Sequence, residues 1–343
     1  MTERLEQAVA EAVPARSVET IASQNTRHGN ETAYVTFADA DPVYVKTATD
    51  TTVRLEREVA ATQYAAAHCP VRVPPVVDAD PTGEVPYLVT EPLPGTVLND
   101  PWTDWVDEET AAGPVDSVDS PNSVADSITD DTGPELMWVT GFTLAGVHDA
   151  RFDRVGVITG GDADGLELTG TSWTETLRAT VEWRASDWFA DRFTDIPERL
   201  VETIDEIDPD LDDTSPALLH GDLSRINVHL DPNGLLDWER ALVGDPAFDL
   251  VDAESHLIDQ VDVDEGDRPV LSRALHAGYR ERAGSLPATL DDYRSLYWAL
   301  SHLLVPQTFE EWAPTVDRPT DELASDVREE FDSRLAAARE ALT

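Results

Sequence analysis

The segment PALLHGDLSRINVHLDPNGLLDW, residues 216–238, restricts the fold more than any other part of the chain. INVHL and GLLDW are rich in strand-forming residues and flank the turn sequence DPNG, which predicts a β-hairpin. Folding the hairpin about this turn pairs Leu230 with Leu235. The chain must therefore carry a short hairpin directly after a loop that contains His and Asp.

This predicted hairpin brings polar side chains together at its open end. Asn227 is placed beside Asp237, and Asp222 lies on the loop that leads into the same end. Two carboxylates and an amide oxygen are hard ligands of the kind that suits Mg²⁺, which commonly takes one or two protein carboxylates plus substrate phosphates. A carboxylate that is not a metal ligand can accept a proton from a hydroxyl nucleophile.

A second hairpin is predicted near the N-terminus. TAYVTFA and PVYVKTA are rich in β-branched and aromatic residues and flank the turn signal DADP. Because side chains alternate along a strand, Val43 and Val45 point to one face, while Tyr44 and Lys46 point to the other. Lys46 therefore stands away from the packed face of a small sheet.

Lys46 is the single lysine in a chain with 24 lysine and arginine residues in total. A lysine places a compact ammonium where arginine would place a larger planar fork. Either Lys46 occupies a position that requires this ammonium, or one lysine has survived by chance in a lysine-depleted composition. Its place on a strand just before a glutamate-bearing helix favours a required ammonium.

That helix is predicted from RLEREVAATQYAAA, which has good helix composition and Thr51 or Thr52 as a cap. Glu58 and Glu56 both lie on it, and Glu58 is favoured as a partner for Lys46. Two short strands follow around the turn DPTGE. The remaining chain is predicted to be mostly helical, with residues 216–238 as its one β segment, and residues 99–135 form an acidic insertion with a mobile middle.

The overall charge is extreme, with 69 acidic against 24 basic residues and a formal net charge of −45. Such self-repulsion destabilises a compact state in dilute buffer, whereas about 1 M salt shortens the Debye length to about 3 Å. The composition is like that of proteins from salt-accumulating halophiles, and we interpret it as adaptation to the solvent. An acidic surface made for a basic partner is the weaker alternative, because the acids are spread along the chain.

The same composition excludes several classes of function. No basic cluster is present to neutralise phosphates, so nucleic-acid binding is not expected. No stretch approaches the roughly 18 apolar residues of a membrane helix. The N-terminus carries acids where a signal peptide has basic residues, and Cys69 has no partner for a disulfide. We therefore expect a cytoplasmic protein without a membrane partner.

These motifs resemble a known family. HGDLSRIN is similar to the HxDxxxxN catalytic loop of the protein-kinase-like fold, in the HGD form of aminoglycoside phosphotransferases and related small-molecule kinases. LLDWERALVGDPAFDL resembles the metal-binding strand and following loop of that family, with DWE in the place of DFG. PYLVTEPLPG is similar to its hinge between lobes. Arg225 and Ile226 depart from the family, which often has Pro-Gly there, and a contact of Arg225 with phosphate is left open.

The resemblance implies roles for the residues of the catalytic segment. Asp222 would be the catalytic base or would orient the acceptor hydroxyl, while Asn227 and Asp237 would hold Mg²⁺ at the nucleotide phosphates. Asp249 would be structural and would anchor the catalytic loop.

Further roles fall on the N-terminal part of the chain. Lys46 would contact the α- and β-phosphates and pair with Glu58. The remaining nucleotide contacts implied are a loop over the phosphates at His28, Gly29 and Asn30, and backbone groups facing adenine at Glu91 to Leu93.

Together these points predict an α+β, two-lobed protein-kinase-like fold. Residues 1–93 would form a nucleotide-binding N-lobe with a small antiparallel sheet and one helix, and residues 94–343 a mainly helical C-lobe with the catalytic hairpin. The predicted activity is ATP- and Mg²⁺-dependent transfer of the γ-phosphoryl group to a hydroxyl of a small molecule, with GTP not excluded.

Two alternatives remain open at this point. A non-catalytic nucleotide-binding or interaction module could keep the same fold. A protein kinase is disfavoured because no activation loop with an APE-like end follows DWE. The sequence indicates neither the acceptor, nor the oligomeric state, nor whether the acidic insertion is a lid or a solvated loop.

Overall fold

The computed structural model describes residues 2–14, 16–24, 29–112, 133–186, 189–206, 211, 214–259 and 263–341. The chain forms two compact units, each made of several chain segments. Unit 1 comprises Met1–Asp104, Ile158–Leu168 and His220–Ala241, and unit 2 comprises Trp105–Val157, Thr169–Leu219 and Leu242–Thr343. The division at residues 93 and 94 stays a prediction.

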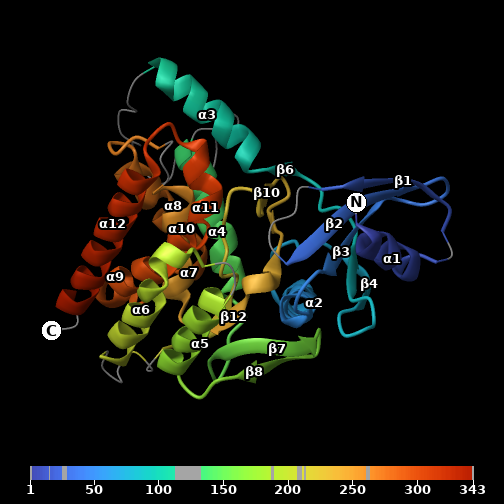
Figure 1. The fold of residues 1–343 in the computed structure, drawn as a ribbon, viewed down its shortest axis with the longest axis horizontal. Helices are drawn as coiled ribbons and strands as arrows, with labels where there is room; N and C mark the ends of the chain where they lie inside the picture. Colours follow the sequence, from blue (N-terminus) through green and yellow to red (C-terminus); the bar gives the residue numbers. More distant parts are fainter. Residues whose placement is uncertain are drawn as a thin grey trace. The chain divides into compact units, whose positions relative to one another are not determined.

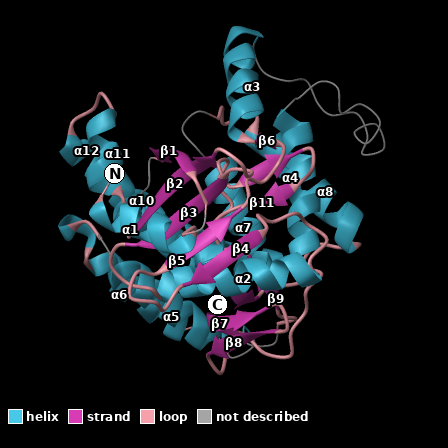
Figure 2. Cartoon of the chain, turned by 90° about the vertical axis from the view of Figure 1, so that its right-hand side faces the viewer, coloured by secondary structure: helices cyan, strands magenta, loops and turns pink. Residues whose placement is uncertain are grey.

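Unit 1 contains a five-stranded antiparallel sheet, drawn in blue to cyan in Figure 1, with the strand order β1-β2-β3-β5-β4 (Figure 2). The predicted N-terminal hairpin is confirmed as β2 and β3, in which Tyr34 pairs with Tyr44 and Thr32 with Lys46. The strands are β1 (Val18–Ser23), β2 (Asn30–Phe37), β3 (Val43–Ala48), β4 (Val76–Asp80) and β5 (Tyr87–Thr90). The predicted alternation also holds, because Val43 and Val45 are buried while Lys46 lies on the other face.

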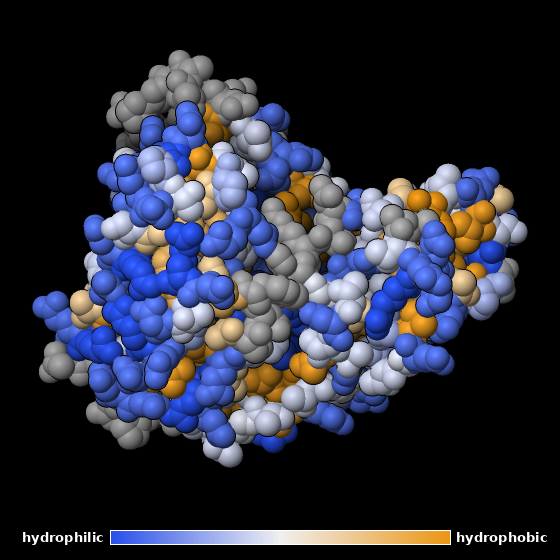
Figure 3. Space-filling model, viewed as in Figure 1, coloured by the Kyte–Doolittle hydropathy of each residue, from blue (hydrophilic) through white to orange (hydrophobic). Residues whose placement is uncertain are grey.

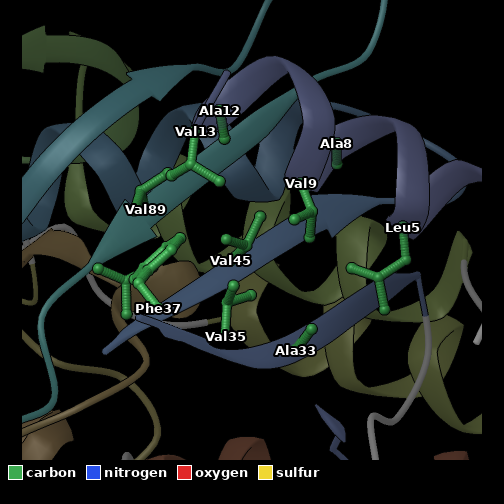
Figure 4. Close-up of a cluster of buried hydrophobic side chains, with 11 residues drawn as sticks. Leu5, Ala8, Val9, Ala12, Val13, Ala33, Val35, Phe37, Val45 and Val89 are labelled. Atoms are coloured by element: carbon green, nitrogen blue, oxygen red, sulfur yellow. The ribbon is translucent and has the colours of Figure 1, made fainter. Parts of the chain in front are cut away.

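Helix α1 (Glu3–Ala12) covers one face of this sheet. The Thr2 side chain caps it by accepting a hydrogen bond from the Leu5 amide. Its apolar residues recur at helical spacing and point toward side chains of β2, β3 and β5 (Figure 4). This core comprises Leu5, Ala8, Val9, Ala12, Val13, Ala33, Val35, Phe37, Val43, Val45 and Val89.

Helix α2 (Val53–His68) confirms the predicted helix after β3. Many of its buried residues are small or apolar, as expected for a helix that packs closely. Three charged residues on it are also buried, namely Arg54, Arg57 and Glu58. Buried charges need partners, so this helix must face other polar groups of unit 1.

The hairpin predicted within residues 216–238 is present, but its predicted register is wrong by two residues. Strand β10 (Val228–Leu230) pairs with β11 (Gly234–Leu235) so that Val228, and not Leu230, lies opposite Leu235. The reason is Gly234, which belongs to the ladder and not to the turn. A Cβ atom there would lie 2.9 Å from the Arg72 carbonyl oxygen, and Arg72 bonds both to Asn233 and to Leu235.

Strand β6 (Thr96–Val97) adds to this hairpin and completes a three-stranded sheet with the order β11-β10-β6. A further sheet has the order β8-β7-β12-β9. Figure 2 shows its hairpin β7 (Gly156–Asp162) and β8 (Gly165–Thr169), which the sequence did not predict. The other two strands are β9 (Ala217–Leu219) and β12 (Leu242–Gly244).

The described part of unit 2 is mainly helical, as predicted. Its helices are α4 (Gly133–Val147), α5 (Trp173–Ser186), α6 (Asp195–Asp205), α7 (Pro246–Leu257), α8 (Arg268–Ala283), α9 (Leu290–Ser301), α10 (Leu304–Gln307), α11 (Phe309–Trp312) and α12 (Thr320–Ala341). Helices α4 and α8 cross closely at two glycines. A Cβ atom on Gly141 would lie 2.0 Å from the carbonyl oxygen of Leu275, and one on Gly278 would lie 1.9 Å from that of Trp138.

The acidic insertion is only partly described. Residues 99–112 form helix α3 (Asn99–Ala112), which the sequence did not predict, and residues 113–132 lie outside the described ranges. Hydrophilic residues, drawn blue, cover much of the face in Figure 3, as the composition leads one to expect. Within the ranges that the structure describes, no helix is both long and apolar enough to span a membrane.

Candidate active site

Lys46 lies among three carboxylates within unit 1. Its Nζ atom is 2.7 Å from Oε2 of Glu58, 2.9 Å from Oδ1 of Asp237 and 3.1 Å from Oε2 of Glu239. The Lys46 side chain is only 14% exposed. An ammonium has three N–H donors, so each of these carboxylates can accept one of them.

The electrostatics of this cluster are dominated by burial and by the excess of negative charge. Burial by itself would lower the pKa of Lys46, but Asp237, Glu239 and Glu58 together raise it well above its usual value. Burial raises the pKa of Glu58, and Asp237 and Glu239 add to this rise, while Lys46 opposes it. Lys46 is therefore firmly cationic, and its one positive charge faces three acidic side chains.

The loop that carries Asp222 is tied to the hairpin by its own polar groups. Nδ2 of Asn227 donates a hydrogen bond to the backbone carbonyl of Asp222 at 3.0 Å. The backbone N–H of Asn227 donates to the backbone carbonyl of Ser224, also at 3.0 Å. The Asp222 carboxylate lies 3.7 Å from Nε of Arg240. Asp222 and Asn227 are thus brought together as predicted, in the same unit as Lys46.

Asp237 has an unusual backbone conformation, with φ 62° and ψ 68°. This left-handed region is uncommon for a residue other than glycine, although Asp adopts it more readily than most. The chain is held on both sides of it. Nε2 of His220 lies 2.8 Å from the Leu236 carbonyl oxygen, and the fully buried Trp238 packs edge-on against the His220 ring. His220 therefore has a structural role in setting the position of Asp237.

The start of β2 adds a further polar contact. Gly29 has φ 77°, and its carbonyl accepts a hydrogen bond from the Thr49 amide at 2.7 Å. Asn30 is buried, and its Nδ2 donates to Oε2 of Glu239 at 2.6 Å. Asn30 thus lies at the edge of the cluster and Gly29 directly precedes it, while His28 lies outside the described residues.

The predicted hinge residues follow β5. The Glu91 amide already donates to the Pro75 carbonyl at 2.9 Å, so in this structure it does not face an adenine. Leu93 packs close to Gly234, because a Cβ atom on that glycine would lie 2.8 Å from Cδ2 of Leu93. A role of this segment in binding adenine stays a prediction, carried by its remaining backbone groups.

Three residues near Lys46 were given no role from the sequence. They are Glu239, which contacts Lys46 and Asn30, and the buried Arg54 and Arg57 of α2. Arg57 donates to the carbonyls of Ile158 and Glu239 at 3.1 and 3.2 Å. The sequence signal that could have indicated Glu239 was its place as the third residue of DWE. The signal for Arg54 and Arg57 was the presence of two arginines on a helix that has to pack against the rest of unit 1.

Arg225 lies against an aromatic ring. Its guanidinium carbon is 4.4 Å from the ring centroid of Trp102, which is fully buried. This distance is typical of a cation–π contact. In this structure Arg225 therefore has a structural contact on the catalytic loop.

His148 and Asp249 form a buried pair in unit 2. Nε2 of His148 lies 3.2 Å from Oδ2 of Asp249, and Nδ1 of His148 lies 2.8 Å from the hydroxyl of Tyr279. The pair connects α7 with the end of α4 and with α8. The predicted anchoring of the catalytic loop by Asp249 remains a prediction.

Among the three acidic side chains around Lys46, Asp237 is the most exposed and is the one open to a hard divalent cation. One carboxylate oxygen from each of Glu58, Asp237 and Glu239 lies within 4.8 Å of the others. Asn227 uses its Nδ2 as a donor, so its side-chain oxygen remains available as an acceptor. Oxygen ligands of this kind are those that Mg²⁺ prefers.

Solved structures with the same architecture match nearly the whole chain. APH(2")-IIia in complex with GDP and kanamycin is 16% identical with a TM-score of 0.55, and the match covers 97% of this chain and 98% of that one. Macrolide 2'-phosphotransferase MphH from Brachybacterium faecium is 17% identical, with a TM-score of 0.50 and coverage of 99% and 97%. A thermostable mutant of aminoglycoside phosphotransferase APH(4)-Ia, bound to ADP and hygromycin B, is 14% identical, with a TM-score of 0.54 and coverage of 99% of both chains. At these identities the matches establish the fold, and the predicted fold class is confirmed.

The sequence itself matches a family. Residues 140–287 match the model of the phosphotransferase enzyme family, a range that includes Asp222, Asn227 and Asp237. A search of curated proteins found no significant match. The enzyme class predicted from the sequence is confirmed by this match, residues 140–287 are similar to the phosphotransferase enzyme family, and the chain has the protein-kinase-like fold.

Proposed function

We propose that this protein transfers the γ-phosphoryl group of ATP to a hydroxyl group of a small molecule, with Mg²⁺ as cofactor. The observation that carries the proposal is the arrangement of Lys46, Glu58 and Asp237 in one compact unit with the loop of Asp222 and Asn227. These are the polar groups that phosphoryl transfer on a protein-kinase-like fold requires.

In this proposal Asp222 acts on the acceptor. Its carboxylate accepts a hydrogen bond from the acceptor hydroxyl, aligns the oxygen in line with the γ-phosphorus, and takes the proton as the new O–P bond forms. The bond between the γ-phosphorus and the bridging oxygen of ADP breaks in the same displacement. Catalysis is then mainly positioning and charge stabilisation, with no covalent enzyme intermediate.

Lys46 and the two oxygen ligands serve the phosphates. Lys46 neutralises charge on the α- and β-phosphates while Glu58 holds its ammonium in place. Asn227 and Asp237 would hold Mg²⁺, which when bound offsets the charge of the phosphate oxygens. Gly29, Asn30 and the backbone from Glu91 to Leu93 are proposed to complete the nucleotide site, within an N-lobe of residues 1–93.

The acceptor is proposed as a small polyhydroxylated or amine-bearing molecule. Relatives of the same fold were solved with kanamycin or with hygromycin B, and with GDP or with ADP. Both ATP and GTP therefore belong in the first assay, together with a panel of such acceptors. We further propose that the enzyme works in the cytoplasm, in a salt-rich solvent that its charge of −45 suits.

The test is a coupled assay of nucleoside diphosphate release in molar KCl, with each nucleotide and each acceptor. Substituting Asp222→Asn should lower kcat by at least about 100-fold, because general base catalysis contributes factors of that size. Nucleotide affinity, measured by calorimetry, should stay within about threefold because Asp222 is not placed on the phosphates. An acceptor-dependent rate that is unchanged by Asp222→Asn would show that the assignment is wrong.

A matched control is Asp164→Asn, which removes the same charge from an exposed turn between β7 and β8. It should leave both kcat and nucleotide affinity unchanged. Failure of the wild-type protein to bind any nucleotide would reject the proposed function as a whole.

A further inference from the structure

We propose that Glu239 is a positioning residue that couples the start of β2, where the chain enters the sheet from the predicted phosphate loop, to Lys46. The inference rests on the proposed function, because it concerns how the nucleotide-binding groups are held. Glu239 does not touch the reacting atoms in this proposal. It acts through Asn30 and Lys46.

One carboxylate oxygen of Glu239 serves two elements at once. Oε2 accepts from Nδ2 of Asn30 at 2.6 Å and from Nζ of Lys46 at 3.1 Å. Asn30 is the first residue of β2 and is 6% exposed, and Lys46 lies on the adjacent strand. Any shift of Glu239 must therefore move both groups, since hydrogen bonds weaken steeply when their geometry is lost.

Glu239 is itself held from the side of α2. Its other oxygen, Oε1, lies 3.9 Å from the guanidinium of Arg54, and its backbone carbonyl accepts from Arg57 at 3.2 Å. Both arginines are at most 5% exposed, so these contacts are little screened by solvent. The segment Trp238–Arg240 is thus attached to α2 through the backbone and the side chain of Glu239. Because Glu239 also accepts the hydrogen bond of Asn30, the position of α2 helps to fix the position of Asn30.

This arrangement gives Glu239 a different role from its neighbour Asp237 in the same DWE sequence. The Asp237 side chain is 37% exposed, and Lys46 is its one partner among the described ion pairs. The Glu239 side chain is 12% exposed; its Oε2 accepts two hydrogen bonds, and its Oε1 forms a longer ion pair with Arg54. A carboxylate held in this way by several protein partners is organised to position them.

The inference is tested by a double-mutant cycle on Asn30→Ala and Glu239→Ala, read as the dissociation constant of ADP in EDTA. Without divalent metal, this reading is independent of the metal ligands. Each single variant should weaken ADP binding about tenfold, the size expected for a hydrogen bond to a charged group. The double variant should be no weaker than the worse single variant, because both remove the same coupling.

Two more variants separate positioning from other roles. Glu239→Gln keeps an acceptor for Asn30 and should recover part of the metal-free ADP affinity that Glu239→Ala loses. Glu19→Ala removes an exposed carboxylate of β1 and should leave ADP binding unchanged. If Glu239→Ala proves too unstable to titrate, Asn30→Ala and Glu239→Gln still test the coupling, because both leave the buried charges of α2 close to a polar partner.

The outcomes are distinct. Independent effects, with the double variant weakened about a hundredfold, would overturn the coupling, and so would unchanged ADP affinity in Asn30→Ala. If Glu239→Gln lost only the Mg²⁺-dependent part of binding, Glu239 would be a metal ligand and the positioning role would be rejected. If wild-type protein bound no nucleotide with or without Mg²⁺, the proposed function would fail and this inference with it.

Discussion

Substituting Gly141→Ala should destabilise the protein, although alanine is the better helix former. The added Cβ atom would lie 2.0 Å from the carbonyl oxygen of Leu275 and 3.1 Å from the amide nitrogen of Tyr279. Ordinary contact begins near 3.4 Å, so the backbones of α4 and α8 must separate by about 1.4 Å. Neither partner is a flexible side chain that can rotate away.

The expected free-energy loss follows from three contributions. Overpacking of a close contact costs about 1–3 kcal/mol and sometimes more, and two rigid helices place this site at the upper end. Separation also stretches the 2.8 Å contact between Tyr279 and the buried His148, worth about 1 kcal/mol. Helix propensity returns about 1 kcal/mol. The net loss is about 3 kcal/mol, or about 4 °C in Tm for a chain of this length that unfolds as one unit.

Scanning calorimetry in molar KCl would measure the difference, with Gly266→Ala as the matched control. Nothing lies within 4 Å of a Cβ atom built on Gly266, so this variant should stay within about 0.5 kcal/mol of wild type. A Gly141→Ala protein as stable as wild type, or more stable, would show that α4 and α8 do not approach as closely as described.

Three other predictions concern charge. Lys46→Arg should keep the free energy of unfolding within about 1 kcal/mol of wild type but lower kcat/KM by at least about 100-fold. Lys46→Met should lower kcat/KM as well and also reduce the free energy of unfolding by about 3 kcal/mol, because it leaves the buried carboxylates unpaired. Calorimetry would measure the stability of each variant, and the coupled assay its kcat/KM. Burial lowers the pKa of His302 to about 3, helped by Arg334 and His256. The unfolded chain therefore binds a proton more readily below pH 6.5, stability falls on acidification, and His302→Gln should recover up to about 2 kcal/mol of the loss between pH 7 and pH 5 in urea titrations. Finally, Tm should rise from 0.1 to 2 M KCl, because salt screens the repulsion within a chain of charge −45; a flat or falling Tm would contradict solvent adaptation.

Local patterns predicted the elements whose own residues decide them. The hairpin of β2 and β3 follows from alternation with a turn signal, and its register places Lys46 as expected. Strand β1 was missed because five of its six residues are exposed, which leaves no alternation to detect. The hairpin of β7 and β8 was missed because its sequence GVITGGDADGLELT contains four glycines among few strand formers.

Contacts between distant segments could not be predicted in this way. The sequence favours Gly234 as a turn residue, but the approach of Arg72 requires a residue without Cβ in the ladder, and this moves the register of the hairpin by two residues. The contact of Asn30 with Glu239 joins residues 209 apart, and no local pattern marks it. The candidate ligands themselves were found because HGD, Asn and DWE keep their spacing within one short segment.

A comparison of Arg57 with Lys46 explains why an arginine would not suit the position of Lys46. Arg57 uses its planar guanidinium to reach two separate backbone carbonyls, those of Ile158 and Glu239, which suits a wide and flat donor group. Lys46 has the opposite task, because a single nitrogen must lie within 2.7–3.1 Å of carboxylates from three different positions. A guanidinium spreads its charge over three nitrogens in one plane, so it cannot face all three carboxylates at these distances from the same strand position. Within one compact unit, the chain uses arginine where donors must diverge and its one lysine where charge must be concentrated.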